Sequence, residues 1–354
     1  MSVKKWISPL QGLESLSQVA GPLPTPGPGE VFVKINAVAL NYRDVEVVKG
    51  EYKHHKTAEQ DATIVPCSDM CGTILSIGSD VSQWSEGDRV LSTFVPEHYT
   101  GQVTEKALSG SLGLPVDGVL ATHRIFPAYA LVAAPAYMSD EEACTLPIAA
   151  LTAWMSINGT RPVGQAGGNH EYILVQGTGG VAIAGLQIAK AAGAKVIITS
   201  SSDAKLNQAK QFGADCTINY RTTSNWEDQV MQFTQGHGAD IILETGGAQT
   251  LRKSFDCIAW GGLINCIGYV SGKVDATEDR LNVNLLALRR TVTLKGILNG
   301  PKDRFEEMLQ FYEAHQIKPV VNRVFSFAEA KKAFEFLESG SHFGKVVIQI
   351  HSQQ

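Results

Sequence analysis

The sequence lacks a long apolar run, because Gly, Pro or charged residues interrupt its longest apolar segments. A membrane-spanning helix needs about 20 consecutive, mostly apolar residues, so we expect no membrane span. The opening segment, MSVKKWISPL, has two lysines but no apolar run behind them. A secretory signal requires such a run. We therefore expect a cytoplasmic protein that does not act at a membrane.

Cysteine is scarce, and its spacing is not that of a metal site. The six cysteines include no CxxC pair, and no four of them have the spacing of a zinc knuckle. In a cytosolic chain we expect all of them to be buried thiols that act as small hydrophobic residues. They are Cys67, Cys71, Cys144, Cys216, Cys257 and Cys266.

Charge is also limited. Only 18% of the residues are charged and the formal net charge is −5, so no overall field attracts nucleic acid or anionic lipid. We expect no nucleic-acid partner. The 44% hydrophobic content is typical of globular proteins, and 354 residues suffice for two domains.

The N-terminal part is predicted to be rich in β-strands. Residues 31–37 alternate in the period of a strand, and short segments such as 72–77 and 88–92 follow, separated by turn residues. This pattern favours a compact, barrel-like β domain. Near the C-terminus, Ser326 and Glu329 form a capping box for a helix, and residues 345–350 are predicted to form a closing strand.

From Glu171 onward, short apolar runs alternate with helical stretches. This alternation predicts an α/β fold with a doubly wound parallel sheet, the Rossmann architecture. We expect a dinucleotide-binding domain over residues 149–299 and a β-rich catalytic domain formed by residues 1–148 and 300–354. The predicted strands are residues 172–175, 196–199, 216–220, 240–243, 263–267 and 292–298, and the first two predicted helices are residues 180–192 and 203–212.

The strand at Tyr172 runs into a glycine fingerprint that opens a helix. Gly177 permits the tight turn, Gly179 permits close approach of a pyrophosphate, and Ala182 stands in the third place, where alanine is a known variant. The helix N-terminus then offers N–H groups to phosphates. The predicted cofactor-binding residues of this segment are Gly177, Thr178, Gly179, Gly180 and Val181.

The end of the second strand indicates which dinucleotide is bound. NAD sites place an Asp or Glu there, whereas this chain has Ser200 and Ser201, followed by Lys205. Hydroxyls with a cation suit a 2′-phosphate and favour NADP, although an NAD site that uses hydroxyls alone stays open. Either Ser202 or Asp203 is expected to cap the next helix.

Other cofactor contacts are expected where the remaining strands end, because ligands bind at the carboxyl edge of such a sheet. The candidates are Tyr220, Thr245, Gly246, Ile267, Gly268 and Leu298.

Three further segments resemble the medium-chain dehydrogenase/reductase superfamily, in particular its zinc-free, quinone-oxidoreductase-like branch. They are Val38–Asp44, the run from Gly118–Ala121 to Leu146–Pro147 and Leu151–Trp154, and Phe343–Val347. The resemblance covers nearly the whole chain. It implies a GroES-like catalytic domain and adds Thr152, Phe343 and Lys345 to the cofactor contacts.

The resemblance also implies that no zinc is bound. The zinc-dependent branch has a Cys at or beside Arg43 and a His-Glu pair where this chain has Ser68 and Asp69. Asp69 alone cannot hold a catalytic zinc, which takes about three protein ligands. Cys67 and Cys71 add no complete ligand set.

Without zinc, another group must stabilise charge on the substrate oxygen. The resemblance indicates Asn41 and Tyr52, and an amide N–H₂ and a phenol can both donate to an oxyanion. Tyr42 and Asp44 flank the same segment, and we expect Asp44 to fix the loop. Tyr52 has an alternative interpretation as a surface tyrosine.

Together these observations predict an enzyme, a zinc-independent NADPH-dependent oxidoreductase that transfers a hydride to a quinone or an activated C=C bond. Two alternatives stay open: an NADP-dependent carbonyl or alcohol dehydrogenase acting on a specialised metabolite, and a non-catalytic NADPH-binding or interaction protein. We also expect a homodimer, because the strand at residues 292–298 is apolar and lies at a sheet edge.

Overall fold

The computed structural model describes residues 2–53, 62–274 and 282–351. The chain divides into two compact units. The β-rich unit comprises residues 1–149, 301–313 and 318–354, and the sheet unit comprises residues 150–300 and 314–317. Among the described residues, no helix combines the length and the apolar character that crossing a membrane requires.

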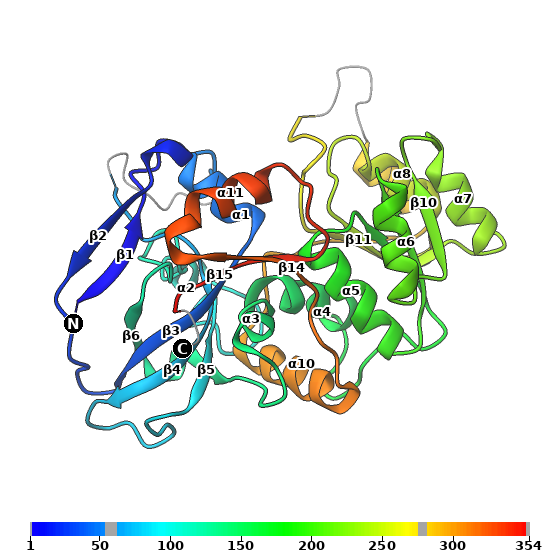
Figure 1. The fold of residues 1–354 in the computed structure, drawn as a ribbon. Coiled ribbons are helices and arrows are strands. Elements are labelled where there is room, and N and C mark those ends of the chain that lie inside the picture. The colour runs from blue at the N-terminus through cyan, green and yellow to red at the C-terminus, as the bar shows by residue number, and fades with distance from the viewer. Residues whose placement is uncertain (1, 54–61, 275–281, 352–354) are drawn as a thin grey trace. The chain divides into compact units, whose positions relative to one another are not determined.

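The β-rich unit consists of short strands with a few helices between them (Figure 1). Its strands are β1 (Val3–Ile7), β2 (Ser17–Gly21), β3 (Glu30–Leu40), β4 (Asp69–Ile77), β5 (Arg89–Ser92), β6 (His123–Pro127), β7 (Leu131–Ala133), β14 (Val321–Ser326) and β15 (Lys345–Gln349). Its helices are η1 (Leu13–Ser15), α1 (Tyr42–Val48), α2 (Glu105–Leu108), η2 (Ala128–Ala130), α3 (Asp140–Ala143), η4 (Phe327–Glu329) and α11 (Ala330–Glu338); η3 (Leu146–Ala150) and α10 (Lys302–His315) begin in it.

The long strand β3 is central to this unit. Its sheet runs in the order β14-β15-β3-β4-β5-β7, and β6 pairs with β3 as well. Val38 lies opposite Met70 of β4 on one side and Ile348 of β15 on the other. Strands paired on both sides and covered on both faces need apolar residues throughout, which explains why most of β3 is buried. The last residue of the strand, Leu40, is therefore buried.

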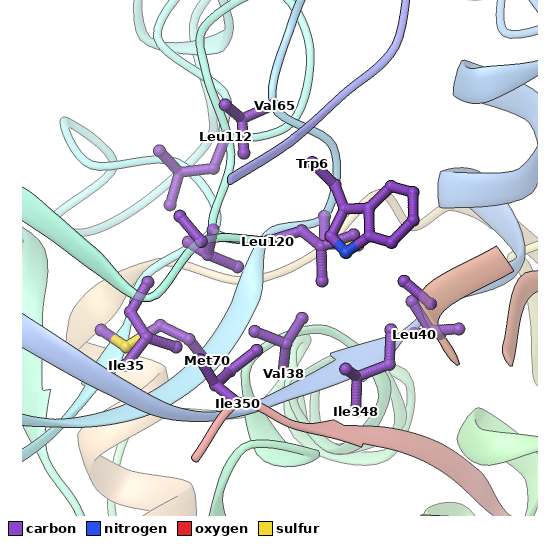
Figure 2. Close-up of a cluster of buried hydrophobic side chains, with 14 of the residues drawn as sticks. Trp6, Ile35, Val38, Leu40, Val65, Met70, Leu112, Leu120, Ile348 and Ile350 are labelled. Atoms are coloured by element: carbon purple, nitrogen blue, oxygen red, sulfur yellow. The ribbon is translucent and has the colours of Figure 1, made fainter. Parts of the chain in front are cut away.

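The core of the β-rich unit brings together residues that are distant in the sequence. Figure 2 shows Trp6, Val38, Leu120 and Ile348 among the side chains of one buried cluster. The indole Nε1 of Trp6 donates to the backbone oxygen of Phe327 at 2.9 Å, so its one polar atom is satisfied. Helix α11 covers the same cluster with one face, which comprises Ala330, Ala333, Phe334 and Leu337.

The sheet unit alternates strands and helices, as the sequence predicts (Figure 1). Its strands are β8 (Tyr172–Gln176), β9 (Lys195–Ser200), β10 (Cys216–Asn219), β11 (Ala239–Glu244), β12 (Ile258–Cys266) and β13 (Thr293–Gly296). Its helices are α4 (Leu151–Asn158), α5 (Gly180–Ala191), α6 (Asp203–Gln211), α7 (Trp226–Phe233), α8 (Leu251–Cys257) and α9 (Val283–Arg289).

All neighbouring strands of this sheet are parallel, in the order β10-β9-β8-β11-β12-β13. This is the doubly wound order, in which β8 and β11 flank the point where the strand order reverses. The predicted fold class is confirmed. Helix α5 lies against the sheet so closely that a Cβ on Gly185 would be 2.7 Å from the Leu243 side chain.

One local prediction differs from the structure, and one open alternative is decided by it. The strand predicted over residues 292–298 is shorter, because β13 covers only Thr293–Gly296 and its side chains are largely exposed. It does lie at the sheet edge. Helix α6 is capped by Ser202, whose hydroxyl accepts from the Lys205 N–H, whereas Asp203 is already the first helical residue. Ser202 has the extended backbone that an N-cap requires.

Candidate functional site

The glycine fingerprint of the sheet unit forms a tight turn between β8 and α5. Gly177 has a φ of +79°, which side-chain-bearing residues rarely adopt, and a Cβ there would project into open space. Its N–H donates to the oxygen of Thr199 at 2.9 Å. Gly179 is the N-cap of the 12-residue helix α5, followed by Gly180 and Val181. The turn therefore presents bare backbone and a helix N-terminus, as an anion site requires.

The end of β9 carries the hydroxyl and ammonium groups predicted to select the dinucleotide. Ser200 is buried at the strand end, and Ser201 is half-buried. The Asp203 carboxylate accepts from the Asn219 amide at 2.7 Å, so Asn219 holds the one acidic group of this segment. Lys205 is the third residue of α6, and partial burial lowers the pKa of its side chain.

The remaining strand ends form a connected group of loops. The N–H of Ile267 donates to the oxygen of Glu244 at 2.8 Å, and that of Gly268 does so at 3.3 Å. Gly246 lies in the loop after β11, and its N–H donates to the Glu244 carboxylate at 2.9 Å. Leu298 follows β13 and is half-buried, whereas Tyr220, after β10, is 45% exposed. The structure therefore brings Gly246, Ile267 and Gly268 together.

Thr152 lies in α4 of the same unit. It is 2% exposed, and its hydroxyl oxygen has no hydrogen-bond partner among the described residues. Its backbone oxygen accepts from the Ser156 hydroxyl at 2.8 Å. A buried hydroxyl normally finds a partner, so this one is available to a bound molecule.

In the β-rich unit, Asn41 stands where β3 ends and α1 begins. It is the N-cap of α1, and its own N–H donates to the Asp44 carboxylate at 2.8 Å. This reciprocal arrangement is a capping box. Asp44 therefore fixes the start of the helix, and with it the backbone that carries Asn41.

A buried lysine orients the Asn41 side chain. The ammonium of Lys345 donates to the backbone oxygen of Leu40 and to Oδ1 of Asn41, both at 2.6 Å. A lysine can only donate, so the oxygen of the Asn41 amide must face it. The Asn41 amide nitrogen, Nδ2, is buried and makes no hydrogen bond to any residue that the structure describes.

Burial controls the ionisation of this cluster. Burial raises the pKa of Asp44 to about 7, against the opposing charge of Arg43. Burial also raises the pKa of Asp69, although the Lys345 ammonium and the Asn41 amide oppose that change. The same burial lowers the pKa of Lys345, against the attraction of Asp69 and Asp44. The cluster is a lysine between two carboxylic groups, shielded from water.

The other predicted residues of this unit lie beside the cluster or away from it. The guanidinium of Arg43 stacks 4.7 Å from the Tyr52 ring centroid and 4.9 Å from that of Phe94. Tyr52 also packs against the small cluster of Val47, Ile64 and Leu114. Tyr42 is half-exposed, and Phe343 is buried two residues before Lys345.

Two family models match the chain. The model "Alcohol dehydrogenase GroES-like domain" matches residues 27–136, and "Zinc-binding dehydrogenase" matches residues 180–314. A zinc-type alcohol dehydrogenase-like protein of Schizosaccharomyces pombe is 41% identical over 323 residues, which cover 91% of each chain. The chain belongs to the medium-chain dehydrogenase/reductase superfamily.

Two further comparisons agree with this assignment. An acryloyl-coenzyme A reductase of Metallosphaera sedula is 29% identical over 335 residues, 92% of this chain and 93% of the relative. The crystal structure of a putative alcohol dehydrogenase from Sinorhizobium meliloti superposes with a TM-score of 0.87 at 34% identity and covers 99% of both chains. The expected superfamily and GroES-like domain are confirmed.

Membership in this superfamily makes the protein an oxidoreductase that binds a nicotinamide cofactor. The sheet unit fits a nicotinamide cofactor. The backbone of the Gly177 turn is unobstructed, and the buried Thr152 hydroxyl makes no hydrogen bond within the described residues. When bound, the cofactor supplies or accepts a hydride.

The superfamily also includes zinc enzymes, and the described residues around Asn41 and Asp69 do not fit a zinc ion. Asn41 Oδ1 receives the Lys345 ammonium, and the Asp69 oxygens accept from the Ser68 hydroxyl at 2.7 Å and the Ile148 N–H at 3.1 Å. A zinc ion takes Cys, His or carboxylate ligands, usually three in a catalytic site, and an ammonium beside them repels it. Within the described residues, no three His, Cys, Asp or Glu side chains group as metal ligands.

Two residues that connect neighbouring strands of the sheet unit were not among those predicted from the sequence. Gln176 and Glu244 end β8 and β11, and their buried side chains join at 2.7 Å. A signal for them exists, since each places a polar side chain directly after a run of three apolar residues at the end of its strand. Their meeting depends on β8 and β11 being neighbours, which the strand order decides.

Proposed function

We propose that the protein is a zinc-independent, NADPH-dependent reductase that transfers a hydride to a quinone or to an activated C=C bond. The nicotinamide supplies the hydride. The protein binds the cofactor, orients the acceptor and stabilises the charge that develops on the acceptor oxygen.

The preference for NADPH is supported by the end of β9. Ser200 and Ser201 offer hydroxyls, and Lys205 is a partly desolvated amine whose charged form an anionic partner would stabilise. The Asp203 carboxylate, which would repel a 2′-phosphate, is held by Asn219 at 2.7 Å. A phosphate is the ligand that this set of groups recognises best.

The observation that carries the reductase proposal is the orientation of Asn41. Because Lys345 holds its oxygen, the amide N–H₂ is the donor end of the side chain: it is buried, makes no hydrogen bond within the described residues, and faces the Asp69 carboxyl, whose pKa it lowers. Such a donor is already oriented before the reaction and is worth most in a site that excludes water. We propose that it donates to the carbonyl or quinone oxygen of the acceptor.

Conjugated acceptors suit a site of this kind. In an enone or a quinone the negative charge spreads over several atoms, so a hydrogen bond can stabilise it without a Lewis acid. Tyr52 is proposed as a second donor and Asp44 as the residue that fixes the helix start. The M. sedula relative is named for the reduction of a conjugated C=C bond.

The test is a titration of metal-free protein with NADPH and NADH, followed by nicotinamide fluorescence, with a quinone, an enone and an aldehyde then added. Tight NADPH binding with quinone or enone turnover supports the proposal. Turnover of the aldehyde alone supports a carbonyl dehydrogenase instead, and binding without any turnover supports a non-catalytic role. Tighter binding of NADH overturns the cofactor assignment.

The Asn41→Asp variant tests the proposed donor directly. Its carboxylate can still accept from Lys345, but it has no N–H₂ to offer. We expect kcat to fall about 100-fold, the usual effect of losing one oxyanion donor, with cofactor binding intact. Asn36→Asp is the matched control, because Asn36 lies in β3, the strand that leads to Asn41, and donates to the Thr73 hydroxyl at 3.0 Å.

A homodimer is proposed through the free edge of the sheet unit. Strand β13 ends the sheet, and the Gly261 N–H donates to the Arg290 oxygen at 2.8 Å beside it. Trp260 is 73% exposed and Leu288 is 75% exposed on this side of the unit. An apolar sheet edge favours pairing with a second copy. A monomeric mass by light scattering at working concentration would overturn the proposal.

A further inference from the structure

A buried carboxylate lies at the carboxyl edge of the sheet unit, between two loops that the sequence analysis assigned to the cofactor. Glu244 is 1% exposed. Its Oε2 accepts from the amide nitrogen of Gln176 at 2.7 Å and from the Ser254 hydroxyl. Its Oε1 accepts from the N–H groups of Gly246 at 2.9 Å and Gly247 at 3.0 Å, and from the Thr250 hydroxyl. All five groups donate, so both carboxyl oxygens of Glu244 act as acceptors.

Gln176 completes the arrangement from the neighbouring strand. Its amide nitrogen faces Glu244, so its Oε1 is free to accept, and it accepts from the N–H groups of Thr245 and Gly246, both at 3.2 Å. The Thr245 hydroxyl donates to the Gln176 backbone oxygen at 3.0 Å. Residues 245–247 are thereby held from both β8 and β11.

The glycines of this loop have no room for a side chain. A Cβ on Gly246 would lie 2.2 Å from the Thr250 hydroxyl oxygen, and Gly247 has a φ of +92° with the Tyr269 backbone 2.7 Å from its Cβ position. The loop then holds the one after β12, because the Ser271 N–H donates to the Gly246 oxygen at 2.7 Å. A shift of residues 245–247 would therefore move the loop after β12 as well.

These loops lie at the point where ligands bind in a doubly wound sheet. Gln176 immediately precedes Gly177, the first glycine of the fingerprint. The Gln176–Glu244 pair thus couples the fingerprint turn to the loops after β11 and β12. It does so through side chains that are themselves buried.

We propose that Gln176 and Glu244 are positioning residues for the cofactor, acting through the backbone of residues 245–247 rather than by contact with the ligand. This inference rests on the nicotinamide binding of the proposed function. The pair lies at the ends of β8 and β11, away from the residues after β9 that are proposed to bind the 2′-phosphate. It therefore supports binding of NADPH and NADH equally.

Exchanging the two side chains gives the sharpest test. Glu244→Gln alone turns an amide N–H₂ towards that of Gln176, and Gln176→Glu alone sets carboxylate against carboxylate. Each is expected to weaken binding of both NADPH and NADH about 10-fold or more, the cost of a buried group left without its partner. The double exchange, Gln176→Glu with Glu244→Gln, restores one amide facing one carboxylate and is expected to recover most of the affinity.

Thr234→Val controls for a merely structural effect. Thr234 lies before the opposite end of β11, where its buried hydroxyl accepts from the Gly238 N–H at 2.9 Å and donates to the Val230 oxygen at 2.9 Å. Its replacement should lower the unfolding midpoint without changing cofactor affinity. Ser254→Ala, which removes one donor to Glu244, provides a milder variant should Glu244→Gln fail to fold.

The measurements are dissociation constants from nicotinamide fluorescence and unfolding midpoints of the cofactor-free variants. The proposal is supported if the single variants bind both cofactors more weakly, the double exchange recovers the affinity, and Thr234→Val keeps the wild-type affinity. Unchanged affinity in the single variants, no recovery in the exchange, or an equal loss in Thr234→Val overturns it. Wild-type protein that binds NADPH without turnover overturns the reductase proposal alone, whereas wild-type protein that binds neither cofactor overturns both.

Discussion

Replacing Lys345 by Met removes the charge that holds the buried cluster of the β-rich unit. Methionine keeps an unbranched chain of similar length, so packing changes little. What disappears is the ammonium that donates to Leu40 and Asn41 at 2.6 Å and faces Asp44 and Asp69. Asp44, whose pKa burial raises to about 7, would then keep only the charge of Arg43 to favour its ionised form at pH 8.

The expected cost follows from burial. Lys345 is 5% exposed, and Asp44 and Asp69 are fully buried. Breaking a buried ion pair by removing one partner typically costs about 3–5 kcal/mol. We therefore expect the free energy of unfolding of Lys345→Met to be lower than that of the wild type by about this amount at pH 8. The loss should be smaller at pH 5, where Asp44 is protonated in the folded protein.

The assay is denaturant unfolding of the wild type, Lys345→Met, Asp69→Asn and the double variant. If the charges interact, the double variant should be less destabilised than the sum of the singles by about 1–3 kcal/mol. Lys332→Met is the control, since Lys332 is exposed and should change stability by less than about 0.5 kcal/mol. A Lys345→Met variant within about 1 kcal/mol of the wild type at pH 8 would refute the reasoning.

Three further predictions concern other parts of the chain. Because the pKa of Asp44 is raised from 3.8 to about 7, folded protein binds this proton more tightly than the unfolded chain, so its contribution to stability falls as pH rises through this window. Asp44→Asn should remove that part of the pH dependence, up to about 4 kcal/mol by unfolding titrations between pH 4 and 8. Lys205→Ala should weaken NADPH binding about 10-fold and leave NADH unchanged, whereas Lys210→Ala, in the last turn of the same helix, should change neither; equal losses for both cofactors would remove Lys205 from 2′-phosphate recognition. Phe334→Ala, in the face of α11 that covers the β-rich core, should lower the free energy of unfolding by about 3–5 kcal/mol, and a loss under about 1 kcal/mol would contradict its placement in that core.

The sequence by itself determined the cofactor-binding architecture, because the signals for it are local. The apolar run ending at Gln176, the Gly177–Ala182 fingerprint and the alternation of strands and helices all depend on residues within a few positions of one another. The capping boxes at Asn41 and Ser326 are local in the same way. Each of these features could be derived from residue types and spacing.

Tertiary structure alone decided how the chemistry-bearing side chains meet. Lys345 contacts Asn41, 304 positions away in the sequence, because β15 pairs with β3. This contact holds the amide oxygen of Asn41, so the amide nitrogen is the end that can donate. Gln176 reaches Glu244 across 68 positions because β8 and β11 are neighbours at the reversal of strand order. Pairings between strands follow from packing of whole elements. No local pattern of residues predicts these strand pairings, and both buried polar clusters depend on them.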